Sequence, residues 1–278
     1  MAIELCSPDG LDAEDQAAVR GLAAAVEADD GQPPLSDQAL THLGAASARH
    51  VVAHDADRLV GYAQLDGRSL EIAASTDVLE PLLDEFDGQA LLVWSHGRRS
   101  RLAAVLGQRG FAQVRTLHQL RRSLDDPLPE RALPSGIEIR AFVIGRDEDA
   151  WTRVNAAAFA HHPEQASWAR TDLEAREAET WFDPSGFLLA WRGAALVGFH
   201  WTKLHADHVG EVYVIGIDPS AQGGGLGAVL LQRGLTYLRD RECSQVLLYV
   251  DDSNTTAMRL YERSGFNRYD LDVQWERT

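Results

Sequence analysis

The chain has 278 residues, of which 45% are hydrophobic and 24% charged, a composition typical of a globular protein with one large domain or two smaller ones. Its 42 acidic residues outnumber its 26 basic ones, and the net charge of -16 argues against nonspecific binding to nucleic acid or anionic lipid. Two cysteines are too few for a disulfide framework or a CxxC zinc site. Because no signal-like leader and no run of 18 apolar residues is present, we expect a cytoplasmic protein.

The first half of the sequence predicts a β-hairpin, a short strand and a closing helix. The hairpin strands are expected at residues 50–53 and 59–65, which are rich in apolar and β-branched side chains. A third strand begins with Glu71. The closing helix is expected to end at Gly110, because glycine readily adopts the left-handed conformation that terminates helices.

A proline-rich, charged stretch at residues 125–134 interrupts the chain near its middle. Repeated prolines exclude a helix and remove the N–H donors that a sheet needs. We therefore predict an N-terminal domain at residues 1–126, a linker at 127–135 and a C-terminal domain at 136–278.

The second half repeats the order of the first. A hairpin is expected at residues 187–191 and 196–201, a strand begins with Glu211, and a closing helix ends at Gly265. This internal repetition predicts two similar domains of the α/β class, each built on a mixed sheet. The spacing differs, because 54 residues separate Glu211 from Gly265 whereas 39 separate the equivalent residues of the first half.

The additional residues of the second half include a glycine-rich loop after the strand that ends at Ile217. Consecutive glycines allow several backbone N–H groups to converge, and the helix predicted to start near Leu226 adds the positive end of its dipole, so the loop favours a pyrophosphate. A flexible turn is the alternative interpretation. A P-loop is disfavoured because the segment has no lysine. A dinucleotide-binding fingerprint is disfavoured because the loop lies late in its domain.

Two motifs resemble the GCN5-related N-acetyltransferase family. The loop has the spacing Gln-x-x-Gly-x-Gly, and residues 254–266 follow the pattern Asn-x-x-Ala-x-x-x-Tyr-x-x-x-Gly-Phe. The resemblance extends over both halves and implies two tandem acetyltransferase domains, the first lacking the pyrophosphate loop. It implies acetyl-CoA as co-substrate and no metal.

The resemblance also implies which residues bind acetyl-CoA. The pantetheine arm is expected along the strand before the loop, and the pyrophosphate is expected in the loop itself. Tyr249 is among them, with a buried strand aromatic as its alternative interpretation. The assigned residues are Ile215, Gly216, Ile217, Gln222, Gly223, Gly224, Gly225, Leu226, Gly227, Ala228, Tyr249, Asn254, Thr255, Thr256, Ala257, Met258 and Arg259.

Acetyl transfer to an amine needs a base for the amine and an acid for the departing thiolate. Glu211 is the candidate base, with a surface acid as the alternative. Tyr261 is the candidate acid, with an aromatic anchor as the alternative; it follows Asn254 by seven residues and therefore lies on nearly the same helix face. A backbone N–H near Ile217 is the candidate oxyanion donor.

Tandem members of this family that the chain resembles from end to end acetylate the cysteinyl amine of a glucosaminyl-inositol pseudo-disaccharide. The resemblance implies that Asp37, Glu164, Lys203 and Glu211 bind this small molecule. Lys203 is the only lysine of the chain, and a solvated surface lysine is its alternative interpretation; for Asp37 the alternative is an acid at a helix N-terminus.

Other functions remain open at this point. The acceptor amine can belong to a protein N-terminus or an antibiotic, and a non-catalytic acyl-CoA sensor is a further alternative. In the first domain Asp77 and Glu80 occupy the region where the loop is missing and would repel a pyrophosphate, so we expect a structural domain that forms one wall of the acceptor site. The pair His161 and His162 is expected to be loop structure, since adjacent residues rarely share a metal. We expect a monomer that binds neither nucleic acid nor membrane.

Overall fold

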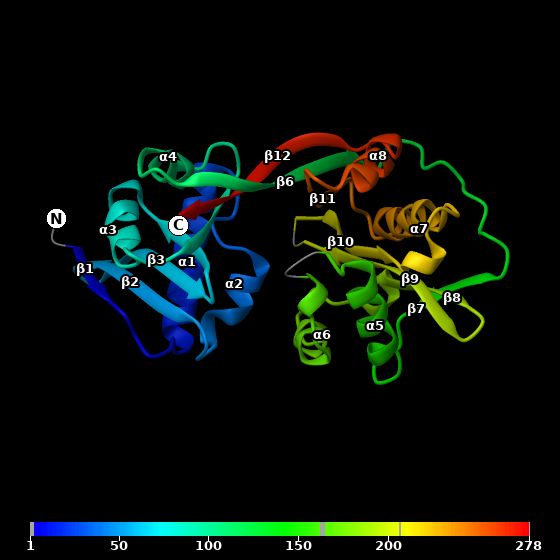
Figure 1. Cartoon of the computed structure of the whole chain (residues 1–278), viewed down its shortest axis with the longest axis horizontal. Coiled ribbons are helices and arrows are strands. Elements are labelled where there is room, and N and C mark those ends of the chain that lie inside the picture. The colour runs from blue at the N-terminus through cyan, green and yellow to red at the C-terminus, as the bar shows by residue number, and fades with distance from the viewer. Residues whose placement is uncertain (1–2, 162–164, 206, 278) are drawn as a thin grey trace. The chain divides into compact units, whose positions relative to one another are not determined.

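A computed structural model describes residues 3–161, 165–205 and 207–277 (Figure 1). The chain forms two compact units. Unit 1 comprises Met1–His118, Asp251–Ser253 and Asp270–Thr278, and unit 2 comprises Gln119–Val250 and Asn254–Tyr269.

Unit 1 is a mixed sheet with helices on both faces. The strands follow the order β1-β2-β3-β4-β5-β12, and all neighbours are antiparallel except β4 and β5. Its elements up to the fourth helix are β1 (Ile3–Cys6), α1 (Ala13–Asp30), α2 (Asp37–Thr41), β2 (Arg49–Asp55), β3 (Arg58–Asp66), β4 (Ser69–Ala74), α3 (Leu79–Asp84), β5 (Leu91–His96) and α4 (Arg101–Gln108).

Two apolar clusters hold the helices of unit 1 to the sheet. On one face Val19 of α1 and Leu43 pack with the strand residue Tyr62. On the other face Leu82 of α3 and Leu106 of α4 pack with the remaining strand side chains. Because the sheet is covered on both faces, side chains on both sides of its strands are buried.

Two long strands, β6 (Ala112–Ser123) and β12 (Asn267–Arg277), contribute residues to both units. The unit 1 portion of β12 pairs antiparallel with β5, so that Asp272 lies opposite His96. The last strand in the sequence therefore completes the sheet of the first unit.

Unit 2 has the same kind of sheet, with the order β11-β10-β9-β8-β7. In this order β10 and β11 run parallel, whereas the pairs β10–β9, β9–β8 and β8–β7 are antiparallel. Its elements are β7 (Ile137–Ala141), α5 (Glu148–Ala158), α6 (Arg170–Glu177), β8 (Phe187–Arg192), β9 (Ala195–Leu204), β10 (Val209–Ile217), α7 (Leu226–Asp240), β11 (Gln245–Asp251) and α8 (Thr255–Arg263).

The core of unit 2 is rich in aromatic rings. Trp151 of α5 packs edge-on against Trp201, and Trp201 stacks on Phe187 with ring centroids 4.4 Å apart. The opposite face of the sheet is covered by α7 through Leu230 and Leu231. These rings fix β8 and β9 rigidly, and the adjacent β10 carries the residues of interest.

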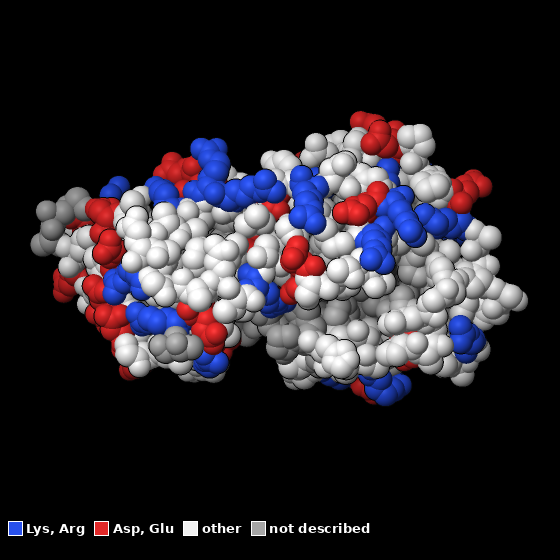
Figure 2. All heavy atoms as spheres, turned by 45° about the horizontal axis from the view of Figure 1, so that its top comes forward, with Lys and Arg blue, Asp and Glu red and all other residues white. Residues whose placement is uncertain are grey.

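The predicted elements are confirmed. Both hairpins form, as β2–β3 and β8–β9, and the two glutamates lie in β4 and β10. Each glutamate is the third residue of its strand rather than the first. Gly110 and Gly265 have φ angles of 79° and 84°, the left-handed conformation expected at these helix ends. Among the described residues, no helix is long and apolar enough to span a membrane, and the face in Figure 2 carries side chains of both charges.

Candidate active site

The strands of unit 2 separate next to Glu211. The parallel pairing of β10 with β11 covers only Val209–Glu211 of β10, whereas on its other side β10 remains paired with β9 as far as Ile217. A β-bulge also interrupts the β9 pairing between Val212 and Val214. Backbone groups on one edge of β10 after Glu211 are therefore available to an extended ligand with amide groups, as in strand addition.

The glycine loop lies directly after this strand. Gly223 and Gly225 have φ angles of 81° and 78°, which L-residues with a side chain rarely adopt. Among the residues that the structure describes, none accepts a hydrogen bond from the backbone N–H groups of residues 223–227. These groups lie just before α7 and in its first turn, and together with the helix dipole they form a suitable site for a phosphate anion.

Free space around Gly224 supports this interpretation. A Cβ atom added at Gly224 would meet no atom within 4 Å, so packing inside the protein does not require glycine there. A ligand that approaches the backbone closely does require it. The loop is tied to the end of β10, because the side-chain amide of Gln222 donates to the carbonyl of Ile217 at 3.2 Å.

Glu211 is buried, with 7% of its surface exposed, and it lies opposite Lys203 in the register of β9 and β10. One carboxylate oxygen, Oε2, lies 2.8 Å from Nε2 of His205. The surface-acid interpretation of Glu211 is therefore wrong. Sequence analysis missed His205; the only signal was its position in the short hairpin between the two strands.

Lys203 is also buried, at 7% exposure. Its ammonium lies 5.0 Å from the ring centroid of Trp181 and 5.6 Å from that of Tyr213, so two aromatic faces stabilise the charge. The interpretation of Lys203 as a solvated surface residue is wrong. Tyr213 in turn accepts a hydrogen bond from Arg176 at 2.9 Å, which fixes the ring beside the bulge of β10.

Tyr261 on α8 is buried at 6% exposure and packs edge-on against Phe266, in the same apolar cluster as Val212. Burial raises the pKa of the Tyr261 phenol well above its usual range, so the group is protonated at neutral pH. No hydrogen-bond partner of its hydroxyl is found among the described residues. The ring thus anchors the helix, and its proton remains available for donation.

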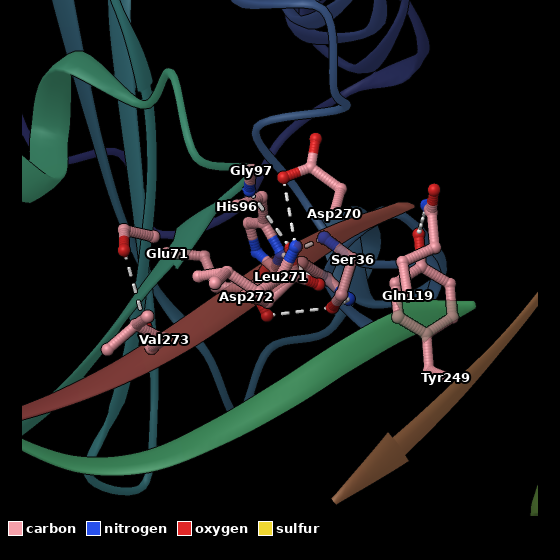
Figure 3. A network of polar contacts seen from close by, with 12 residues as sticks. Ser36, Glu71, His96, Gly97, Gln119, Tyr249, Asp270, Leu271, Asp272 and Val273 are labelled. Atoms are coloured by element: carbon pink, nitrogen blue, oxygen red, sulfur yellow. Dashed lines mark hydrogen bonds and ion pairs between the residues drawn. The ribbon is translucent and has the colours of Figure 1, made fainter. Parts of the chain in front are cut away.

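The other predicted cofactor residues surround the start of α8. Asn254 caps this helix, since its side-chain oxygen accepts from the Ala257 N–H at 3.1 Å. Tyr249 of β11 is 39% exposed, so its interpretation as a buried aromatic is wrong. Figure 3 shows its hydroxyl accepting a hydrogen bond of 2.7 Å from Gln119. Thr255, Thr256 and Arg259 are exposed, as ligand contacts require.

The structure says less about Asp37 and Glu164, the other two residues predicted to bind the acceptor. Asp37 belongs to unit 1, where it is exposed and is the first residue of α2 after the capping residue Ser36. Glu164 lies outside the described residues, as does His162. Within the described ranges, no group of His, Cys, Asp or Glu side chains has the arrangement of a metal site.

The comparisons with known proteins agree with this geometry. Residues 153–266 match the model of the acetyltransferase (GNAT) family. The chain is 48% identical over 284 residues to a mycothiol acetyltransferase from Thermomonospora curvata, covering 96% of this chain and 95% of the relative. It is 47% identical to a mycothiol acetyltransferase from Geodermatophilus obscurus, covering 97% and 96%.

Solved structures share the fold over both units. A tandem GNAT protein from the clavulanic acid biosynthesis pathway superposes with a TM-score of 0.73 at 18% identity, covering 99% of this chain and 98% of that one. A GCN5-related N-acetyltransferase from Sphaerobacter thermophilus gives a TM-score of 0.70 at 24% identity, covering 98% and 95%.

The fold, the glycine loop and these relatives place the chain in the acetyltransferase (GNAT) family. It is an acetyl-CoA-dependent N-acetyltransferase with two tandem domains of that family's fold.

Proposed function

We propose that this enzyme acetylates the cysteinyl amine of cysteinyl-glucosaminyl-inositol (1D-myo-inositol 2-(L-cysteinylamino)-2-deoxy-α-D-glucopyranoside), giving mycothiol and CoA. The observation that carries the proposal is the 48% identity, over 96% of the chain, to a relative named mycothiol acetyltransferase. A similarity of this extent includes both units and not only the cofactor motifs. The buried ionic groups Glu211 and Lys203 further support a polar acceptor carrying an amine.

In this proposal the residues of unit 2 hold acetyl-CoA, which supplies an activated acetyl thioester. The free edge of β10 at residues 215–217 binds the pantetheine amides, and the N–H groups of the glycine loop bind the pyrophosphate. The exposed side chains at the start of α8 and Tyr249 complete the contacts. An N–H of β10 near Ile217 stabilises the oxyanion that forms at the carbonyl.

Glu211 acts as general base and Tyr261 as general acid. The Glu211 carboxylate accepts a proton from the attacking amine, directly or through one water molecule. The C–N bond forms, the C–S bond breaks, and the Tyr261 hydroxyl donates its proton to the departing thiolate.

Acceptor recognition is assigned to Asp37, Glu164, Lys203 and Glu211. The Lys203 ammonium lies beside two aromatic faces, and it is a hydrogen-bond donor suited to the hydroxyl groups of the acceptor. Unit 1 is proposed to be structural and not to bind a pyrophosphate productively. We also propose that the two domains span residues 1–126 and 136–278, and that the enzyme is a cytoplasmic monomer.

Acetyl-CoA consumption by the purified enzyme tests the acceptor. Cysteinyl-glucosaminyl-inositol is the substrate, and glucosaminyl-inositol, which lacks the cysteine, is the matched control. Fast turnover with the cysteinyl compound alone is expected. Equal turnover with both compounds, or none with either while acetyl-CoA still binds, would contradict the proposal and direct the search to peptide or antibiotic amines.

A further inference from the structure

Glu211 is nearly closed off from solvent, yet a general base must release a proton after every turnover. The carboxylate therefore needs a partner that exchanges protons with water. His205 has the position for this role: its Nε2 lies 2.8 Å from Oε2 of Glu211, and 34% of its side chain is exposed, against 10% for Glu211.

The hairpin between β9 and β10 holds His205 in place. Its backbone N–H donates to the carbonyl of Val209 at 2.9 Å, and its carbonyl accepts from the N–H of His208 at 3.2 Å. His208 has a φ angle of 61°, a conformation that a residue with a side chain seldom adopts. The tight turn thus fixes the imidazole against the carboxylate on one side and leaves it accessible on the other.

We propose that His205 is the proton-exchange partner of Glu211, which rests on the proposed role of Glu211 as base. The attacking amine gives its proton to Glu211 as the C–N bond forms. In the resting enzyme the Nε2–H of His205 donates to the Glu211 carboxylate. After the amine has protonated Glu211, exchange with solvent moves the imidazole proton from Nε2 to Nδ1, and the carboxyl donates its proton to the vacant Nε2. The imidazolium then releases the Nδ1 proton to water, which restores the Glu211 carboxylate and the starting tautomer of His205.

The charges around His205 are consistent with this route. Lys203 of β9 lies opposite Glu211 in the register, so a basic residue accompanies the carboxylate in the sheet. Asp207 and His208 are the other titratable residues described in the turn, and both are exposed. Imidazole is the side chain that most readily takes and gives a proton near neutral pH.

Two substitutions at His205 separate proton exchange from simple positioning. His205→Gln keeps an N–H donor for Glu211 but carries no exchangeable proton acceptor, whereas His205→Ala removes the contact and leaves space for a small base. At saturating substrates and low buffer concentration we expect both variants to lose kcat by about tenfold, with little change in KM for acetyl-CoA. Added imidazole is expected to restore the rate of His205→Ala and not that of His205→Gln.

His208→Asn is the matched control, because it changes a histidine of the same turn that does not contact Glu211 and asparagine tolerates the left-handed conformation. Its kcat is expected to be that of the unmodified enzyme. A fully active His205→Gln, or a loss in His205→Ala that imidazole does not relieve at any pH, would overturn the proton-exchange role. Glu211→Gln, measured in parallel, distinguishes the two failures: if it is inactive while the His205 variants are fully active, the base stands and the exchange role fails.

Discussion

Each unit has a glutamate at the same place in its sheet, but the contacts of the two carboxylates differ. In unit 2, Glu211 is contacted through one oxygen by a half-exposed histidine. In unit 1, both oxygens of Glu71 are occupied, one by the N–H of Ser36 at 2.6 Å and the other by its hydroxyl at 2.7 Å. Glu71 is therefore a structural anchor in unit 1, whereas Glu211 in unit 2 contacts a histidine and is the proposed base.

A second histidine reinforces the difference. Figure 3 shows His96 between the carboxylates of Glu71 and Asp272, at 3.6 Å and 3.2 Å. It lies on the strand that separates from β4, just as β11 separates from β10 in unit 2, so its ring occupies the region next to the glutamate. The pairing of β3 with β4 also has no bulge. Both units thus have a glutamate at this position, while the contacts that surround it differ.

Replacing each glutamate tests this comparison most directly. Glu211→Gln should lower kcat by about 10²–10⁴-fold, because the amine then lacks its base, while acetyl-CoA affinity is nearly unchanged. Glu71→Gln is the control and should keep kcat but lower the thermal stability, since the anchor of Ser36 is weakened. Steady-state kinetics and ligand titration check both. An equal loss of affinity and turnover in Glu211→Gln would indicate a structural role.

The glycine loop, which unit 1 lacks, gives the next largest effect. Gly224→Asp should raise KM for acetyl-CoA by about tenfold or more, because a negative charge near the pyrophosphate costs roughly 1–4 kcal/mol. Gly10→Asp in unit 1 is the matched control, since a side chain there also meets open space and the backbone is not left-handed. Its kinetics should be unaffected. Unchanged affinity in Gly224→Asp would remove the loop from the cofactor site.

Removing the proposed acid is expected to have a smaller effect. Tyr261→Phe should lower kcat on the order of 10²-fold with almost no loss of stability, because its hydroxyl has no partner among the described residues. Tyr237→Phe is the contrasting variant: its hydroxyl donates to Asp183 at 2.7 Å, so it should lose about 1 kcal/mol of stability and keep its rate. Kinetics and thermal unfolding of both enzymes decide the assignment, and full activity in Tyr261→Phe would contradict it.

The sequence predicted the features that depend on local patterns. Apolar runs located both hairpins, and the glycine spacing located the loop and the start of α7 at Leu226. These succeed because strand alternation and left-handed glycine are properties of neighbouring residues. The catalytic and binding roles of Glu211 and Tyr261 remain predictions, since composition and spacing do not measure chemistry.

Features that depend on contacts across the sheet could not be predicted. The position of His205 against Glu211 follows from hairpin register, and the burial of Lys203 follows from Trp181, which is distant in sequence. The contact between His96 and Asp272 joins two strands that lie far apart in the sequence. No periodicity records such pairings, which arise only when the strands assemble.

The buried histidines His96 in unit 1 and His200 in unit 2 should make the stability of the two units change in opposite directions with pH. Burial alone would lower the pKa of His96, but the carboxylates of Asp272 and Glu71 outweigh it and raise the pKa from 6.5 to about 10. The stabilisation is therefore complete below pH 6.5 and is lost as pH rises through about 10. The protection factors of the β5 and β12 amides, which correct for the intrinsic pH dependence of exchange, should fall over this range, and His96→Gln should abolish that fall.

The stability of unit 2 should depend on pH on the acidic side of neutrality, and this is the smallest of the expected effects. His200 is fully buried, and burial lowers its pKa from 6.5 to about 4, although the hydrogen bond from Nδ1 to the Leu230 carbonyl partly opposes this. The unfolded chain binds a proton at a higher pH than the folded one, so stability should fall as pH decreases from 6.5 towards 4. The protection factors of the β9 and α7 amides should therefore fall in acid, while those of β5 stay high because His96 is charged. If both units responded alike, the assignment of a charged histidine to one and a neutral histidine to the other would be wrong.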